Sequence, residues 1–168
     1  MIDRISLKIL RPSDVTPRYV SWLSDPLVTR YSDNQYRHVS LSSQKEYVQF
    51  CIENPSIMLW GIYFEHLHIG NVALDNLNFR HSRAEVTYLI GDPNFWGKGI
   101  ASYAVRFVIG YADKVLGLYK LIAGVAEPNV ASIRVLTKCG FIQESRRESH
   151  LFYNNSRLAQ IDFKLILR

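Results

Sequence analysis

The segment from residue 91 to 117 places two glycines directly before the strongest helical pattern in the chain. Apolar side chains recur there at the i, i+3, i+4, i+7 spacing of one helix face. These side chains are Ile100, Tyr103, Ala104, Phe107, Val108, Tyr111 and Val115. Gly117 follows them, and glycine is common just beyond a helix end. The pattern therefore predicts an amphipathic helix that begins near residue 100 and ends at Gly117.

Three shorter segments before this helix are typical of strands. They are rich in β-branched and aromatic residues and are separated by turn-prone or polar stretches, which predicts an antiparallel meander. Their ranges are 57–64, 68–79 and 84–92. Further strands are expected at 5–10, at 120–127 and in a closing hairpin formed by 141–154 and 157–168.

End signals indicate three more helices. One in residues 16–25 begins near a proline and ends before an Asp-Pro pair. A longer one in 40–54 has Ser42 or Ser43 as its predicted cap. The last, in 129–140, runs from an asparagine cap to a glycine stop.

Length and composition limit the classes of protein that this chain can belong to. Its 168 residues, 48% of them hydrophobic, fit a single domain over residues 1–168 with its own core. Cys51 and Cys139 lack C-x-x-C spacing, so neither a disulfide framework nor a zinc site is indicated, and a cytoplasmic protein is expected. No segment approaches the roughly 20 apolar residues of a membrane span, so we expect no membrane partner.

The formal net charge of +5 favours anionic partners in general. Basic residues are scattered along the chain, and no nucleic-acid-binding motif accompanies them, so a nucleic acid is not expected as a partner. A phosphorylated small molecule would satisfy the same charge.

The sequence GDPNFWGKGIA at 91–101 resembles two phosphate-binding loops and matches neither. Five residues separate Gly91 from Gly97 where a Walker loop has four, and Lys98 precedes glycine instead of serine or threonine. A dinucleotide fingerprint would need a third glycine and a preceding βαβ pattern. Free backbone N–H groups at a helix start can nevertheless bind a pyrophosphate. The alternative is that Gly97 and Gly99 only form a tight turn between a strand and a helix.

The order of these motifs carries a resemblance to a known family. WGKGIA at a helix start, then a strand, then NVASIRVLTKCGF, resembles the GNAT superfamily of acyl-CoA-dependent N-acyltransferases. In that family Q/R-x-x-G-x-G/A holds the coenzyme A pyrophosphate. Gly99 and Ala101 match its last two defined positions, whereas Trp96 replaces the usual Gln or Arg, as in the branch similar to ribosomal-protein N-terminal acetyltransferases.

The resemblance implies an α/β (α+β) fold with a mixed, mostly antiparallel twisted sheet. About seven strands and about four helices are expected, in the order β-α-α-β-β-β-α-β-α-β-β. It also implies acetyl-CoA as the acyl donor, with no metal ion. The cofactor-binding residues that it implies are Tyr88, Leu89, Ile90, Trp96, Gly97, Lys98, Gly99, Ile100, Ala101, Asn129 and Ser132. The backbone of residues 88–90 is expected to pair with the pantetheine arm.

Two residues are candidates for catalysis. Strand alternation places Glu85 on the face shared with Thr87, and it is the candidate general base, acting through water. The resemblance implies that Ser132 lies near the departing sulfur, although Asn129 and Ser132 are also ordinary residues for a helix cap and first turn. Many family members carry a tyrosine acid where this chain has Leu136, so Ser132, a water or another tyrosine remains open as the proton donor.

Two histidines, His66 and His68, lie near a strand start without a third metal ligand nearby, and we expect them at the surface.

The amine acceptor is the least determined part of the prediction. The N-terminal pattern resembles relatives associated with amino-sugar nucleotides, so a nucleotide-linked amino sugar is the first hypothesis. Aromatic faces and cations suited to a base and a diphosphate are Trp22, Tyr31, Tyr36, Arg30, Arg37, Arg80 and Arg83. Two rivals stay open: a protein N-terminal or side-chain acetyltransferase of ribosomal-protein type, and a non-catalytic acyl-CoA sensor. A monomer or a homodimer is expected.

Overall fold

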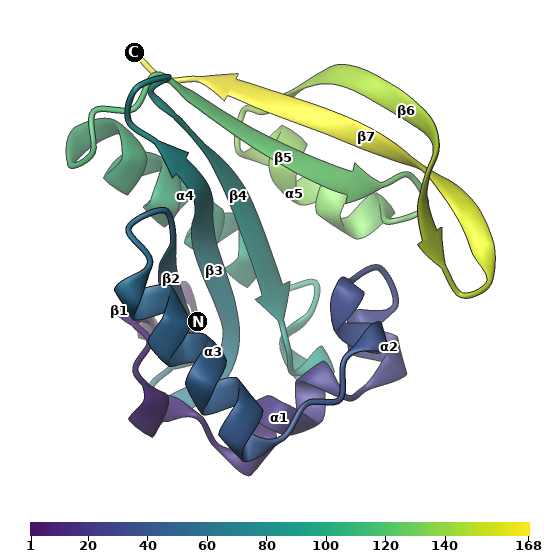
Figure 1. Ribbon diagram of the computed structural model, residues 1–168. Coiled ribbons are helices and arrows are strands. Elements are labelled where there is room, and N and C mark those ends of the chain that lie inside the picture. Colours follow the sequence, from purple (N-terminus) through teal and green to yellow (C-terminus); the bar gives the residue numbers. More distant parts are fainter.

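The computed structural model describes residues 1–168, which form a seven-stranded sheet with helices on both faces (Figure 1). The strands are β1 (Ile5–Ile9), β2 (Met58–Phe64), β3 (Leu67–Asn78), β4 (Arg83–Ile90), β5 (Lys120–Ala126), β6 (Ile142–Tyr153) and β7 (Ser156–Ile166). The helices are α1 (Pro17–Leu23), α2 (Pro26–Thr29), α3 (Leu41–Glu53), α4 (Ile100–Lys114) and α5 (Val130–Lys138). The strand order is β1-β2-β3-β4-β5-β7-β6, and only β4 and β5 run parallel. The predicted fold is confirmed, with α2 as an additional single turn.

Two hydrophobic cores hold the helices to the sheet. The larger contains 24 buried residues and lies between the sheet and α4, on what we call the back face. The smaller, of 11 buried residues, joins α1 and α3 to the opposite, front face. Figure 1 shows α3 in front of the sheet and α4 behind it. None of the helices combines the length and the apolar character that crossing a membrane requires.

Local hydrogen bonds determine where α3 begins. The Ser40 hydroxyl accepts the Ser43 backbone N–H at 3.1 Å, and the Ser43 hydroxyl accepts the Ser40 N–H at 2.9 Å. Ser40 is therefore the cap, and the prediction of Ser42 or Ser43 was wrong because the reciprocal pair places Ser43 at the third helical position.

The helix predicted after the two glycines is α4, but its buried face is made mostly of smaller residues than expected. Ile100, Ala104, Val105, Val108 and Ala112 are almost inaccessible to solvent, whereas Tyr103 and Phe107 are partly exposed. Small side chains let the helix approach the sheet closely. The aromatic residues lie along its flank, where the Phe107 and Tyr111 rings meet Trp60 of β2 edge-on at 5.9 and 5.2 Å.

The sheet opens between β4 and β5. Their parallel pairing ends at Glu85 and Ile122, although β4 continues to Ile90 and β5 to Ala126. Figure 1 shows the two strands diverging toward their carboxyl ends. The edges of β4 and β5 that face this opening have no strand partner there.

The tip of the β6–β7 hairpin is tied to the segment after α2, far away in sequence. The Tyr153 hydroxyl donates to a carboxylate oxygen of Asp33 at 2.8 Å. The Asn154 side-chain amide donates to the Arg30 carbonyl at 3.1 Å. These bonds hold the hairpin tip beside α2, on the side of the molecule where β4 and β5 separate (Figure 1).

Candidate active site

The loop before α4 presents free backbone donors. Gly97 and Gly99 have φ values of 71° and 78°, a left-handed conformation that glycine adopts without steric cost. The backbone N–H groups from Gly97 to Ser102 have no acceptor within the protein. They lie at the positive end of a 15-residue helix. This arrangement can bind an anion through the backbone alone.

Side chains of the loop close the end of β4. The Trp96 indole N–H donates to the Ile90 carbonyl at 2.8 Å. Trp96, which replaces the usual Gln or Arg of the motif, therefore holds the last residue of β4 in place. The Lys98 ammonium lies 5.6 Å from the centre of the Phe95 ring and is exposed. The Ile100 side chain belongs to the larger core, which leaves only its backbone N–H available to a ligand.

Helix α1 anchors the same loop from its other end. Gly91 is buried against Trp22, and a Cβ atom at Gly91 would lie 2.0 Å from the Trp22 ring. The Asp92 carboxylate forms an ion pair with Arg18 of α1 and accepts the Asn94 N–H at 3.0 Å. Trp22 is only 5% exposed, so it cannot offer its face to a base as the acceptor hypothesis required. Its apolar pattern on α1 was a signal for core packing.

Glu85 lies at the point where β4 and β5 separate, half-buried on the front face as alternation predicts. It is directly opposite Asp75 of β3 and accepts a hydrogen bond from the Asn76 side chain at 3.1 Å. Asp75 accepts the Thr87 hydroxyl at 2.7 Å. Burial raises the pKa of Asp75, and the bond from Thr87 acts in the opposite direction. Asp75 was not singled out from the sequence, where a single aspartate within a strand carries no motif.

On the back face, Tyr88 reaches from β4 to α5. Its hydroxyl donates to the Ser132 carbonyl at 3.2 Å. Burial raises the pKa of Tyr88 to about 12, while the bond to Ser132 lowers it. Asn129 caps α5 and accepts the Ser132 N–H at 3.3 Å. The structure thus brings Tyr88, Asn129 and Ser132 together, whereas the Glu85 side chain lies on the other face of β4.

Leu136 is completely buried in the larger core. Its position on α5 matches the expected one, but its side chain carries no donor. Leu136 itself therefore cannot donate a proton.

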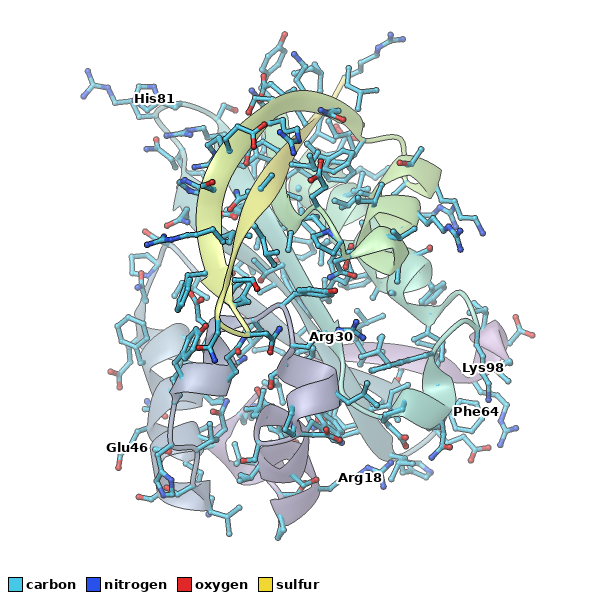
Figure 2. The ribbon with its side chains drawn as sticks, turned by 90° about the vertical axis from the view of Figure 1, so that its right-hand side faces the viewer. Arg18, Arg30, Glu46, Phe64, His81 and Lys98 are labelled. Atoms are coloured by element: carbon cyan, nitrogen blue, oxygen red, sulfur yellow. The ribbon has the colours of Figure 1, made fainter.

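The cations proposed for a diphosphate do not gather at one place. Arg30 follows α2, and its guanidinium lies over the Tyr31 ring at 5.0 Å. Arg37 contacts Asn34 and Tyr47. Arg80 belongs to the β3–β4 turn, and Figure 2 shows its neighbour His81 at the upper edge of the molecule, well away from Arg30 near the middle of the view. The predicted set therefore forms no single site.

His68 is buried, contrary to the prediction of a surface position. Its ring lies 4.9 Å from the ring centres of Tyr19 and Trp22, and its Nε2 is 2.8 Å from the Asn71 side-chain oxygen. Burial lowers the pKa of His68, which favours the neutral ring. The prediction failed because the turn before this strand is shorter than expected, and His68 already faces the smaller core.

A further feature on the front face was missed. A Cβ atom at Gly124 of β5 would lie 2.3 Å from the Gln160 side-chain nitrogen. Gln160 lies on the neighbouring strand β7, and its side-chain amide donates to the Asp162 carboxylate at 2.7 Å. A glycine inside a strand is a signal for such a close approach, and it was available in the sequence.

Comparisons with known proteins identify the family. Residues 4–142 match the family model described as an acetyltransferase (GNAT) domain. The spermidine N(1)-acetyltransferase of Escherichia coli strain K12 is 29% identical over 140 residues, which cover 73% of this chain and 74% of that protein. A putative ribosomal N-acetyltransferase of Bacillus subtilis, YdaF, is 30% identical over 108 residues, covering 64% and 58%.

A solved structure supports the fold. The crystal structure of spermidine N-acetyltransferase from Vibrio cholerae, in complex with CoA and spermine, superposes with a TM-score of 0.87 at 20% identity. The match covers 98% of this chain and 96% of that one. The chain therefore belongs to the GNAT acetyltransferase family and is an N-acetyltransferase.

Proposed function

We propose that this enzyme transfers the acetyl group of acetyl-CoA directly to the primary amine of a small cationic molecule. The observation that carries the proposal is the opening between β4 and β5, which leads to the free N–H groups of the α4 start. An extended pantetheine arm fits an unpaired strand edge, and a pyrophosphate fits the amides from Gly97 to Ser102.

The chemistry asks little of the side chains. The chain must position the amine against the thioester carbonyl, remove one proton from the amine and stabilise the departing sulfur. In this proposal Glu85 takes the amine proton through a water, which is supported by its position where the strands separate and by the absence of a salt bridge to it. In this proposal the backbone of residues 88–90 holds the arm.

The charges on the front face favour a cationic acceptor. Asp75 and Glu85 are cross-strand neighbours, and neither forms a salt bridge. Arg147 interacts with Glu85 at longer range, but it also pairs with Asp162. Two adjacent carboxylates that form no salt bridge of their own attract an ammonium group and repel a phosphate. This supports an aliphatic amine with a second positive charge, of the kind that the spermidine enzymes among the relatives are named for.

The amino-sugar nucleotide is the less favoured acceptor. It would need a positively charged cradle for its diphosphate, and the predicted arginines come from separate places, Arg30 after α2 and Arg80 in the β3–β4 turn. A protein acceptor would need a groove for an extended peptide. The oligomeric state stays a prediction, although one related structure, of spermidine N-acetyltransferase from Vibrio cholerae, is dodecameric.

An acceptor screen with acetyl-CoA tests this function. The panel contains spermidine, a monoamine of similar length, an amino-sugar nucleotide and a peptide with a free N-terminus, and products are read by mass spectrometry. We expect acetylation of spermidine. Turnover of the nucleotide or peptide alone would reverse the choice of acceptor, and tight acetyl-CoA binding without any turnover would support the sensor.

A variant then tests the role of charge. Asp75→Asn should raise the KM for spermidine a few-fold, about 0.5–1 kcal/mol, and leave the KM for the monoamine nearly unchanged. Glu144→Gln is the control, because Glu144 lies on β6 and pairs with Lys120 of β5, away from Asp75. Equal effects on both amines would exclude Asp75 from recognition of the second charge.

A further inference from the structure

We propose that the Tyr88 hydroxyl donates a hydrogen bond to the thiolate that leaves when the acetyl group is transferred. This inference rests on the proposed function and assigns the role that Leu136 cannot fill. It makes Tyr88 a catalytic residue through its side chain, in addition to any contact made by its backbone.

The position of Tyr88 supports this role. It lies three residues beyond Glu85, the last β4 residue paired with β5, so it belongs to the part of β4 that borders the opening. Its side chain is on the back face, between β4 and α5, and its hydroxyl is 3.2 Å from the carbonyl of Ser132 in the first turn of α5. The Tyr88 side chain therefore reaches from β4, on one side of the opening, to α5, on the other.

No other tyrosine with an identified contact brings its hydroxyl to the start of α5. Tyr153 is bonded to Asp33, and Tyr36 to the Phe152 carbonyl, both at the hairpin tip. The Tyr19 hydroxyl accepts a bond from Gln44 inside the smaller core. The remaining candidate at this place is the Ser132 hydroxyl, which has no hydrogen-bond partner in the protein. Tyr88 and Ser132 are thus the two groups to separate by experiment.

The bond changes balance with Tyr88 acting only as a donor. The amine nitrogen forms the new bond to the thioester carbonyl carbon, and the carbon–sulfur bond breaks with its electron pair on sulfur. The proton lost by the amine passes through water to Glu85 and then to solvent. The Tyr88 hydroxyl rotates from the Ser132 carbonyl to the sulfur, and the thiolate takes a proton from solvent when it is released.

The acidity of the phenol fits this role better than a full proton transfer. Burial raises the pKa of Tyr88 to about 12, so the hydroxyl keeps its proton at neutral pH. A thiol has an unperturbed pKa of about 8.5, so a thiolate does not remove that proton. The phenol instead stabilises the developing charge, as a donor in an oxyanion hole does.

The test is the variant Tyr88→Phe, which keeps the ring and removes only the donor. We expect kcat with the amine identified in the acceptor screen to fall by about 10- to 100-fold. This loss is smaller than that on removing a donor to an oxyanion, because a thiolate is a good leaving group and needs less stabilisation. The Kd for acetyl-CoA, measured by calorimetry, should stay within about twofold because the backbone of β4 is unchanged. Ser132→Ala should lower kcat by less than about threefold.

Tyr111→Phe is the matched control, since Tyr111 also packs against the larger core but lies on α4 beside Trp60. Melting temperatures of all variants identify any loss of folding, and kcat is compared per folded molecule. A Tyr88→Phe enzyme with kcat within about threefold of wild type, or a Ser132→Ala enzyme with the larger loss, would overturn the proposal while leaving the proposed function intact. A wild-type enzyme that acetylates no amine would overturn both.

Discussion

Glu85 is the residue whose position is most informative about the reaction. It is the last β4 residue paired with β5, and its contact with Asn76 leaves the carboxylate half-buried and accessible from the front face. A base at this point can reach an amine that approaches the opening from the front.

Glu85→Gln should therefore lower kcat by roughly 10²-fold or somewhat less, the usual range for loss of a general base, and leave acetyl-CoA affinity nearly intact. Raising the pH should recover part of the loss, because solvent can then supply the neutral amine. Steady-state rates across pH check this, with Glu144→Gln as a control. Wild-type kcat at every pH would show that Glu85 is only a strand residue.

Asp162 is the residue with a strong effect on acid stability. Burial opposes its ionisation, but hydrogen bonds from Arg147, Ser145 and Gln160 outweigh burial and lower the pKa of Asp162 to about 2. Because the folded pKa lies below the unfolded value near 3.9, its stabilisation is present above pH 4 and is lost as the pH falls toward 2. Asp162→Asn should thus lower the urea midpoint at pH 7, and the difference from wild type should shrink over pH 4 to 2. A constant difference over that range would contradict this assignment.

Single residues were predictable from the sequence where a local rule applied. Strand alternation placed Glu85 correctly, and an asparagine before a helix was correctly identified as a cap at Asn129. The contact between Tyr88 and Ser132 joins residues 44 positions apart and has no local signature. The burial of Trp22 depends on a glycine in a distant loop, so no pattern within α1 could separate a core tryptophan from a ligand-stacking one.

At the scale of elements, the start of α4 should bind acetyl-CoA through its backbone. Gly99 has a φ of 78°, and a side chain there would extend into open space where the ligand must approach. Gly99→Val should weaken acetyl-CoA binding severely, by strain and by blocking that approach, even if the fold persists. Lys98→Ala should weaken it less, because the amides remain. Calorimetry checks both, and unchanged affinity of Gly99→Val would remove this loop from the binding site.

The junction between α1 and the loop should be sensitive to a single methyl group. In Gly91→Ala the new Cβ would meet the Trp22 ring at 2.0 Å. We therefore expect the free energy of unfolding to fall by about 1–3 kcal/mol and acetyl-CoA to bind more weakly as the loop shifts. Gly110→Ala is the matched control, because a Cβ there meets no atom within 4 Å. It should stabilise α4 by about 0.5–1 kcal/mol. Equal melting temperatures for the two variants would contradict the packing of α1 on the loop.

Elements were predicted well and their details less well. The segments of all seven strands and of the four longer helices were identified, because periodicity and end signals are local. The predicted stripe of α4 correctly contained Ile100, Ala104 and Val108. It also included Tyr103 and Phe107, which are partly exposed, and omitted Val105 and Ala112, which are buried. Which positions are buried depends on how closely helix and sheet approach, which the helix sequence alone does not contain.

The whole molecule is determined by pairings between distant segments. The family resemblance implied the mixed sheet, but the order β5-β7-β6 and the bonds from Tyr153 and Asn154 to the segment after α2 are properties of the folded chain. The residues grouped by the acceptor hypothesis are separated at this scale, because Arg30 follows α2 whereas Arg80 lies in the β3–β4 turn.

The divergence of β4 and β5 also has a consequence for colloidal behaviour. It gives the sheet an inner pair of unpaired edges in addition to the outer edges formed by β1 and β6. An exposed strand edge is a template for other extended chains, and so for aggregation. The acyl donor, by occupying the inner edges, would act as a protective strand. Light scattering during heating should therefore rise at a lower temperature for the enzyme alone than for the enzyme saturated with acetyl-CoA, and a Gly99→Val enzyme should gain little from the added ligand.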